Sequence, residues 1–454
     1  MTSRWAYGED ELRAWFNWMR SIENTQFYFR RSSVYAEEDK EEESVGQDVV
    51  SDSELIDIID MSSLTDLPKG LIFIDGVVRH RVIGTFGNEA VRIPVVFAHM
   101  IAGAMKLESK EPRPLIKKEL KVALFPFKAS REFTGISFLP PYISTLEEEL
   151  DRGSVRFETL LAESDISTIF SDTSVTLGES FNQQRRDLIT GNDLIASGKV
   201  YVVALNRIKE ILRALELALT IYISKTTKDD DLIIVDGPIA PLLKYVGLVN
   251  PSLRKILRLK DTQSALEAYN LLNKVVGAVK KVVKVPSTLT KDISEKGVLN
   301  PAFIYMWRRL IEDQDVSKDD NYISTYVLSA IFRLRPELVF RENYPAFSPL
   351  SGLVRVDVPL PAIMERDEWL SWITQNYEWV GDQGLDRVRQ LIVNNVKSRT
   401  RLKEILNIIY TLRYPLPSAS GYRNLVELYP IKDVEDWLKA YLLTKYEFSA
   451  IGLF

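Results

Sequence analysis

The sequence predicts a mixed α/β protein in which a sheet is flanked by helices. Short apolar runs of strand length, such as residues 71–74 and 232–235, alternate with longer segments whose apolar residues recur every three or four positions, such as residues 200–223. Of the 454 residues, 46% are hydrophobic and 27% are charged, which is typical of a globular protein with a large core. Strands interleaved with helices favour a mixed sheet with helices packed on it.

The N-terminal part is predicted to begin with an amphipathic helix over residues 9–22. Its apolar positions follow helical spacing, and either the core or a partner would cover them: Leu12, Trp15, Phe16 and Met19. The first 24 residues mix charges with aromatic side chains and lack the pattern of a signal peptide, so we expect a cytoplasmic protein.

An acidic, serine-containing run without aromatic residues follows at 36–54 and is predicted to be a solvated loop or linker. Five prolines in residues 106–172 predict an irregular insertion there. The expected organisation is therefore an N-terminal helical segment, 1–35, an acidic linker, 36–55, and one domain, 56–454, that carries the insertion.

Two apolar runs each end in Asp-Gly. Residues 71–74 stop at Asp75-Gly76, which predicts a buried strand followed by a sharp turn. The helix expected over 200–223 leads directly into the second run, 232–235, which stops at Asp236-Gly237. The apolar stretch 93–105 falls short of the ~20 residues of a membrane span and is expected to be a buried helix.

The remaining segments predict further helices and strands. Residues 269–285 are lysine-rich and expected to be helical, 326–332 and the alternating 354–358 are expected to be strands, and the C-terminal third is expected to be helical. The apolar ending, 446–454, is expected to pack back onto the core, with docking onto a partner as the alternative.

The composition excludes several kinds of site. The chain has no cysteine, so disulfides and thiolate zinc sites are excluded, and with only two histidines, His80 and His99, a multi-histidine site is nearly excluded. A metal would be held mainly by carboxylates, which suits Mg²⁺ or Mn²⁺. The formal net charge of −5 means that nucleic acid would need a local basic surface.

Asp75 and Asp236 are the candidate metal ligands because two strands that end in Asp can place both carboxylates at one edge of a sheet. Asp-Gly is also a common turn dipeptide that needs no function. Helical geometry sets Glu216 beside the apolar stripe of its helix, where it is either a third ligand or the ion-pair partner of Lys209 or Arg213.

In their order and spacing, several segments resemble the NurA family of nucleases, which work with the HerA hexameric helicase. The resemblance covers most of the chain and lies in these segments: LIFIDG at 71–76, RALELAL at 213–219, LIIVDGPI at 232–239, VVGAVKK at 275–281, LVRVDVP at 353–359 and YPLP at 414–417.

The resemblance implies an RNase H-like core, Mn²⁺- or Mg²⁺-dependent cleavage of DNA, a ring-shaped homodimer and a HerA-like helicase as partner. By motif, it implies that Asp75, Glu216 and Asp236 are metal ligands and that Tyr414 is the active-site tyrosine. The family's histidine eight residues further on is replaced by Tyr422, and a phenol is a poorer neutral ligand than an imidazole.

Cations near the two aspartates are candidates for DNA contact, although a short basic cluster is also usual on a solvated surface. They are Arg79 and Arg81 just after the first aspartate, Lys280 and Lys281 on the lysine-rich segment, and Arg355 in the alternating strand.

The expected function is a metal-dependent DNA nuclease that processes DNA ends in double-strand break repair with a HerA-like helicase. A catalytically silent NurA-like subunit that clamps DNA or regulates the helicase is the alternative, in line with the missing histidine. The third hypothesis is an unrelated α/β binding protein, and a large distance between Asp75 and Asp236 would favour it.

Overall fold

The computed structural model describes most of the chain. The described residues are 7–22, 26–29, 53–87, 91–108, 111–152, 157, 161, 167–177, 186–195, 197–228, 230–243, 245–250, 252–253, 256, 261–280, 282, 289, 301–307, 327–336, 352–375, 382–413, 428–444 and 447. The predicted linker 36–55, apart from its last residues, and most of the ending 446–454 lie outside them.

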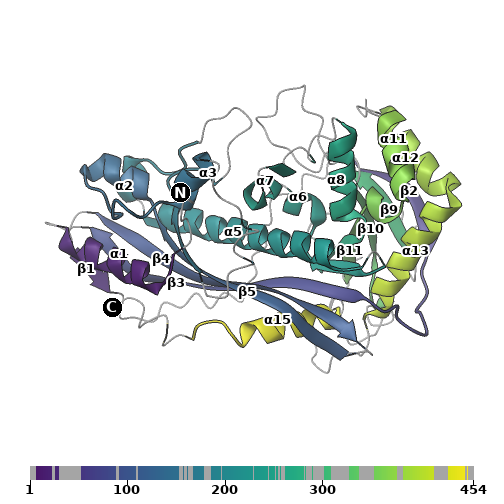
Figure 1. The fold of residues 1–454 in the computed structure, drawn as a ribbon, viewed down its shortest axis with the longest axis horizontal. Helices are drawn as coiled ribbons and strands as arrows, with labels where there is room; N and C mark the ends of the chain where they lie inside the picture. Colours follow the sequence, from purple (N-terminus) through teal and green to yellow (C-terminus); the bar gives the residue numbers. More distant parts are fainter. Residues whose placement is uncertain are drawn as a thin grey trace.

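A large mixed sheet forms the centre of the molecule, so the α/β class is confirmed (Figure 1). Its strand order is β2-β9-β10-β11-β8-β7-β3-β4-β5-β6, with β1 paired to β3. The strands are β1 (Gln26–Phe29), β2 (Ser53–Asp60), β3 (Leu71–Gly87), β4 (Arg92–Glu108), β5 (Glu111–Phe125), β6 (Ser167–Asp172), β7 (Leu232–Asp236), β8 (Val275–Val279), β9 (Pro301–Trp307), β10 (Val327–Arg333) and β11 (Leu353–Pro359).

The middle of the sheet combines both kinds of strand pairing. Strands β3, β4 and β5 are antiparallel neighbours, whereas β3, β7 and β8 run parallel. This arrangement is consistent with the RNase H-like core that the resemblance implies. Because β7 is much shorter than β3, it ends partway along its neighbour.

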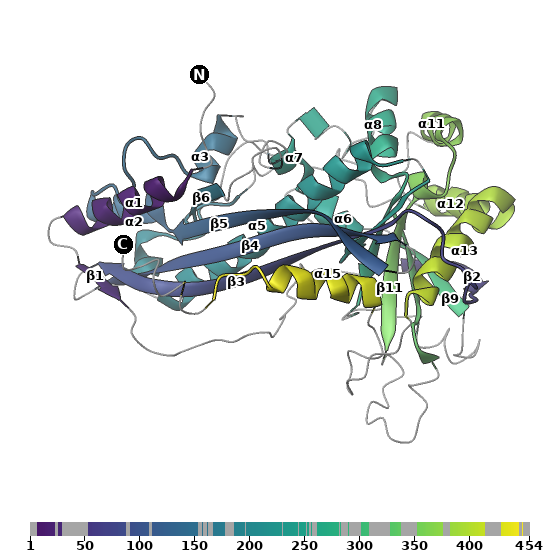
Figure 2. The same cartoon turned by 60° about the horizontal axis from the view of Figure 1, so that its bottom comes forward.

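Helices lie on both faces of the sheet (Figures 1 and 2). They are α1 (Glu9–Ser21), α2 (Phe127–Thr134), α3 (Leu146–Asp151), α5 (Ser197–Thr226), α6 (Ile239–Leu243), α7 (Val246–Val249), α8 (Thr262–Leu272), α11 (Arg366–Gln375), α12 (Asp382–Asn394), α13 (Val396–Thr411) and α15 (Tyr429–Lys439), with short 3₁₀ turns η1 (Gly191–Ile195) and η4 (Leu360–Ala362).

Helices α5 and α15 cover opposite faces of β3 and β4 (Figure 2). At Gly76 of β3, an added Cβ would overlap Glu216 of α5. At Gly103 of β4, an added Cβ would lie 2.5 Å from Leu438 of α15. Gly103 is paired with Asp75, the neighbour of Gly76, and successive residues of a strand point to opposite faces. Asp75 therefore points toward the α15 face.

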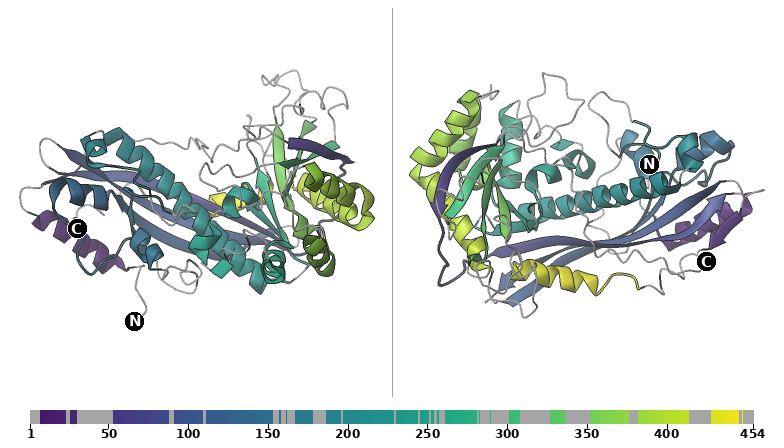
Figure 3. Two further views of the ribbon diagram at one scale, coloured as in Figure 1. Left: turned by 90° about the horizontal axis from the view of Figure 1, so that it is seen from above. Right: turned by 180° about the vertical axis from the view of Figure 1, so that it is seen from behind.

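Several predicted elements are confirmed. Helix α1 buries the four residues of the predicted stripe, and the long helix expected over 200–223 is α5. The strands expected at 326–332 and 354–358 are β10 and β11, and the last third is mainly helical, as seen in Figure 3. Within the described residues, no helix is both long and apolar enough to cross a membrane.

Other predictions were wrong. The apolar stretch 93–105 lies in strand β4 rather than in a helix. Helices pack on both faces of this strand, so its residues are apolar on both faces and do not alternate between apolar and polar. Residues 71–74 do not lead into a turn, since β3 continues through Asp75-Gly76 to Gly87. Lysine-rich 269–285 contains the end of α8 and strand β8, where the run Val-Val-Gly-Ala-Val is buried between β7 and β11.

The segment 106–172 is more regular than its prolines suggested. It contains β5, which belongs to the central sheet, and β6 at the end of the strand order. Pro112 and Pro114 lie in the first part of β5, whereas β6 pairs only with the last part, from Leu120 onward. The two prolines have no N–H group to donate, but β6 does not pair with this part of β5, so no hydrogen bond between β5 and β6 is lost.

Candidate functional site

Asp75 and Asp236 lie side by side at the end of β7. Strands β3 and β7 are parallel and in register up to the pair Ile74 and Val235, and the two aspartates are the next residues. Both side chains therefore leave the sheet at neighbouring positions on the same face. The large separation that would have favoured an unrelated binding protein is not found.

The turn after Asp236 is held by contacts that only small residues allow. Gly237 has a φ of 106°, which favours glycine, and its N–H donates to the Ala278 carbonyl at 2.9 Å. A Cβ on Gly277 would lie 2.5 Å from the Gly237 carbonyl oxygen. The N–H of Ile239 donates to Oδ2 of Asp357 at 3.2 Å. The VVGAVKK and LVRVDVP segments thus support the aspartate of LIIVDGPI.

Glu216 of α5 lies over Gly76, on the face of the sheet opposite to the one toward which Asp75 points, and its charge acts on Asp75 from there. It is 1% exposed, and its Oε2 accepts a 2.7 Å hydrogen bond from Arg213. The Arg213 guanidinium also donates to the Asp236 carbonyl at 3.0 Å, so it links α5 to the end of β7. Burial raises the pKa of Glu216, while Arg213 opposes this rise. Of the two roles expected for Glu216, the ion pair with Arg213 is present.

Asp75 is a buried carboxyl with little compensation for its charge. It is 6% exposed, and its Oδ1 accepts a 2.7 Å hydrogen bond from the N–H of Gly76. Burial raises the pKa of Asp75 well above its ordinary value, and the charge of Asp236 raises it further. Lys280 lowers it, while Glu216 and Glu435 add to the rise. A cation at this position would relieve the repulsion.

Lys280 directly follows β8 and faces Asp236. Its Nζ lies 3.0 Å from Oδ2 of Asp236, and both side chains are about one-fifth exposed, at 20% and 21%. The lysine therefore belongs to the acidic site. From the sequence, Lys280 was expected on a lysine-rich helix, and its position beside Asp236 was not predicted.

Glu435 on α15 is a further carboxylate that the sequence analysis missed. It is 8% exposed and forms ion pairs with Lys439 at 2.6 Å and Lys432 at 3.3 Å. Burial favours a higher pKa for Glu435, but Lys439, Lys280 and Lys432 together lower it to about 2. One feature of the sequence could have identified Glu435: it lies between Ile431 and Leu438, on the apolar stripe of its helix.

The acidic pair fits a hard divalent cation. Among the described residues, no three side chains of metal-binding type converge closely enough to hold an ion by themselves. Mg²⁺, however, keeps several waters and is often bound by one or two carboxylates. Asp75 and Asp236 provide such a pair of hard oxygen ligands, with Asp236 accessible to solvent at 21%.

The cations expected to contact DNA lie in different surroundings. Arg79 is exposed on β3, on the Asp75 face, and donates to the Leu443 carbonyl at 2.5 Å. Arg81 is half-buried further along the strand. Arg355 is only 3% exposed and its Nε lies 3.0 Å from Asp357, so this guanidinium does not face solvent. Lys281, Tyr414 and Tyr422 lie outside the described residues.

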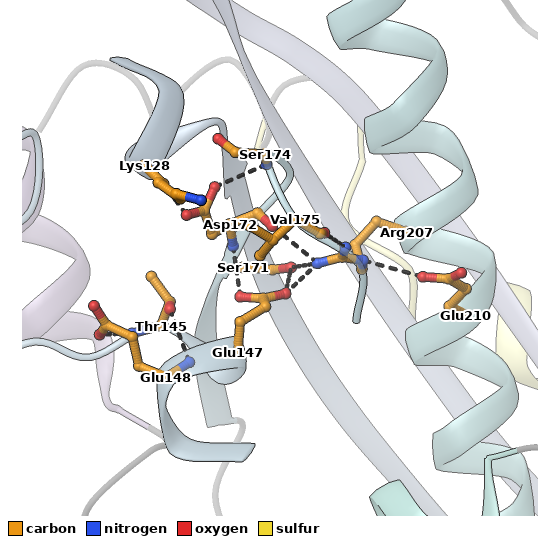
Figure 4. Close-up of polar contacts among 10 residues, drawn as sticks. All are labelled: Lys128, Thr145, Glu147, Glu148, Ser171, Asp172, Ser174, Val175, Arg207 and Glu210. Atoms are coloured by element: carbon orange, nitrogen blue, oxygen red, sulfur yellow. Dashed lines mark hydrogen bonds and ion pairs between the residues drawn. The ribbon is translucent and has the colours of Figure 1, made fainter. Parts of the chain in front are cut away.

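A separate buried network anchors the first half of α5 (Figure 4). Arg207, 1% exposed, contacts Glu147 of α3, the Ser171 hydroxyl at 2.9 Å and the Val175 carbonyl. Glu147 also accepts from the N–H of Asp172 at 2.7 Å. Arg213 and Glu216 lie further along the same helix, so this network helps to position them over the sheet.

Comparisons with known proteins give a structural likeness and no match by sequence. No protein-family model matches the sequence, and no curated protein matches it. The structure is similar to the crystal structure of the NurA nuclease from Sulfolobus solfataricus, with a TM-score of 0.33 and 11% sequence identity, over 86% of this chain and 85% of that chain. A likeness of this size does not by itself indicate an activity.

Proposed function

We propose that this protein is a divalent-metal-dependent DNA nuclease. The observation that carries the proposal is the adjacency of Asp75 and Asp236 on neighbouring parallel strands, with Asp75 buried and incompletely compensated. The segments that resemble NurA motifs favour the NurA type of nuclease, because four of them meet at the end of β7: LIFIDG, LIIVDGPI, VVGAVKK and the helix segment RALELAL.

Each residue near the pair has a proposed role. Asp75 and Asp236 would hold Mn²⁺ or Mg²⁺, and the bound ion would activate a water and stabilise the leaving oxygen of a phosphodiester. Glu216 would complete the acidic site, while Arg213 keeps it oriented. Lys280 and Arg213 would balance the negative charge that a phosphate brings. Tyr414 would orient the phosphate or the water.

The partners are proposed from the same resemblance. The substrate would be DNA ends at double-strand breaks, the working form a homodimer, and the motor a HerA-like hexameric helicase. Arg79 and Arg81 lie on the face of the sheet that carries Asp75, so they are the described arginines best placed to meet a DNA backbone that leads to the site.

Degradation of labelled linear DNA tests the proposal. The wild-type protein is assayed with Mn²⁺, with Mg²⁺ and with chelator, beside the Asp75→Asn and Asp236→Asn variants. Asp187→Asn is the matched control, since it removes a carboxylate from an exposed ion pair with Lys128. We expect metal-dependent cleavage in the wild type and the control, and none in the two site variants.

Two results would contradict this assignment. Normal cleavage by both Asp75→Asn and Asp236→Asn would show that the acidic pair is not the active site. Cleavage that persists in chelator would exclude the metal requirement. Circular dichroism of each variant distinguishes loss of activity from loss of fold.

A catalytically silent subunit that clamps DNA is the second candidate. Two ion pairs favour it, because Lys280 already balances Asp236 and Arg213 already balances Glu216. Such a subunit would bind DNA without added metal and would not cut it, even with a HerA-like helicase and ATP. Cleavage by the purified chain alone would exclude it.

A further inference from the structure

One lysine lies among three carboxylates that come from three different elements. Lys280 forms its ion pair with Asp236 of β7, and its charge lowers the pKa of Asp75 of β3 and of Glu435 of α15. The three acids are far apart in the sequence. The pairing of β3, β7 and β8 brings Asp75 and Asp236 to this lysine, and the packing of α15 on the sheet brings Glu435.

Helix α15 is held close to the acidic pair by its packing. Gly103, the cross-strand partner of Asp75, lies directly beneath α15, and a Cβ there would be 2.5 Å from Leu438 and 2.8 Å from Trp437. Strand β8, which ends just before Lys280, is paired on both sides, with β7 and β11. The backbone on each side of the acidic site is thus fixed.

The side chain of Lys280 is long and partly exposed, whereas the strand that precedes it is paired on both sides. Its stem has four carbons and carries a compact charge that is strongly hydrated in water. At 20% exposure, the side chain reaches solvent without crossing the core. An ammonium 3.0 Å from Asp236 and a divalent cation on the same carboxylate would repel each other strongly.

We propose that the Lys280 ammonium is the resident counterion of this acidic site, and that a divalent cation binds Asp75 and Asp236 only by displacing it. The inference rests on the metal site of the proposed function. Displacement turns Lys280 toward solvent, where its charge is available to a phosphate of the substrate. The lysine would thus balance the acids before the metal binds and the DNA afterwards.

Calorimetric titration of chelator-treated protein with Mn²⁺ tests the inference. The proteins compared are the wild type, Lys280→Met, Lys280→Arg and Lys106→Met. Lys106 is the matched control, because it forms a Lys–Asp ion pair with Asp231 at the other end of β7. We expect Lys280→Met to bind Mn²⁺ at least about tenfold more tightly than the wild type. The other two variants should bind like the wild type.

The central comparison of a second measurement is made on the wild-type protein alone, with and without Mn²⁺, so it does not depend on a variant that folds. The rate at which an acylating reagent modifies Lys280, followed by mass spectrometry, should rise when Mn²⁺ is added, while the rate at Lys106 stays the same. Asp75→Asn should weaken Mn²⁺ binding and remove this increase.

The inference is overturned if Lys280→Met binds Mn²⁺ no more tightly than the wild type, if Lys106→Met gains as much, if Mn²⁺ leaves the labelling of Lys280 unchanged, or if no protein binds Mn²⁺. Its failure differs from that of the proposed nuclease. Metal binding that displaces Lys280 without DNA cleavage would refute the nuclease and leave the counterion role standing. Metal-dependent DNA cleavage, together with Mn²⁺ binding by Lys280→Met that equals that of the wild type, would refute the counterion role and leave the nuclease standing.

Discussion

The backbone N–H of Ile239 donates a 3.2 Å hydrogen bond to Oδ2 of Asp357, and this bond ties the turn after Asp236 to strand β11. Asp357 is fully buried; its Oδ1 accepts a 2.7 Å hydrogen bond from Ser329 and lies 3.0 Å from Nε of Arg355. A buried carboxylate with these three partners therefore determines where the chain turns after the candidate metal ligand.

Asp357→Ala should lower the free energy of unfolding by about 3–5 kcal/mol, because it removes the buried carboxylate that forms an ion pair with Arg355. Ser329→Ala removes one hydrogen bond to the same carboxylate but keeps the bond to Ile239, so it should cost only about 1 kcal/mol. Denaturant unfolding of both variants measures the difference. Equal losses would show that Asp357 does not hold the turn through Ile239 and Arg355.

Gly277→Ala should displace the turn that carries Asp236. The new Cβ would lie 2.5 Å from the Gly237 carbonyl oxygen and 2.9 Å from Cγ1 of Ile239, so the backbone itself must shift. We expect a loss of about 1–3 kcal/mol in stability and weaker Mn²⁺ binding. Gly198→Ala is the control, since its added Cβ would point into open space. If Gly277→Ala binds Mn²⁺ normally, the turn tolerates the shift.

Asp75→Asn should stabilise the metal-free protein at neutral pH. Because burial raises the folded-state pKa of Asp75 above the ordinary 3.8, folding opposes its ionisation, and stability falls as pH rises from 3.8 through the folded pKa. The neutral amide avoids this cost, with a gain of about 0.5–2 kcal/mol. Unfolding curves of chelator-treated protein from about pH 4 to about pH 8 should show the gain shrinking toward low pH. A destabilised variant would contradict the prediction.

His99 should make stability depend on pH on the acid side of neutrality. It is 1% exposed, and its Nδ1 accepts from the N–H of Leu443 at 3.1 Å. Burial lowers its pKa from 6.5 to about 4, against the opposing charge of Glu119. Below pH 6.5 the unfolded chain takes up a proton that the folded chain refuses, so stability present above 6.5 is lost as pH falls toward 4.

The loss attributable to His99 should be on the order of 3 kcal/mol over that range. His99→Gln keeps a polar side chain but removes the titration, so its stability should vary less between these two pH values. Unfolding measurements of both proteins at matched pH test this. Parallel curves would assign the pH dependence to other groups.

Arg207→Met should destabilise the protein by about 3–5 kcal/mol, because it leaves Glu147 charged and buried. Adding Glu147→Gln in the same chain should recover much of this loss, since the uncompensated charge is removed. Glu210→Gln, whose carboxylate is 38% exposed, is the control and should cost less than about 1 kcal/mol. A double variant no better than Arg207→Met would show that charge compensation is not the main role of Arg207.

Local patterns in the sequence determined the elements whose rules are local. The spacing of Leu12, Trp15, Phe16 and Met19 predicted α1, because a helix repeats its buried face every three or four residues. The same rule predicted α5, and Asp236-Gly237 predicted a turn that the φ of 106° confirms. The two Asp-Gly motifs also singled out the aspartates that the sheet brings together.

Only the tertiary structure decided how the chain pairs over long distances. Strand β4 is buried on both faces, so its apolar run has no period that separates a strand from a helix. Strand β3 continues past Gly76 because β4 pairs with it throughout. Lys280 reaches the acidic site through sheet pairing, and Glu435 reaches it through the packing of α15. Both depend on contacts between distant segments, which the local spacing of residues does not reveal.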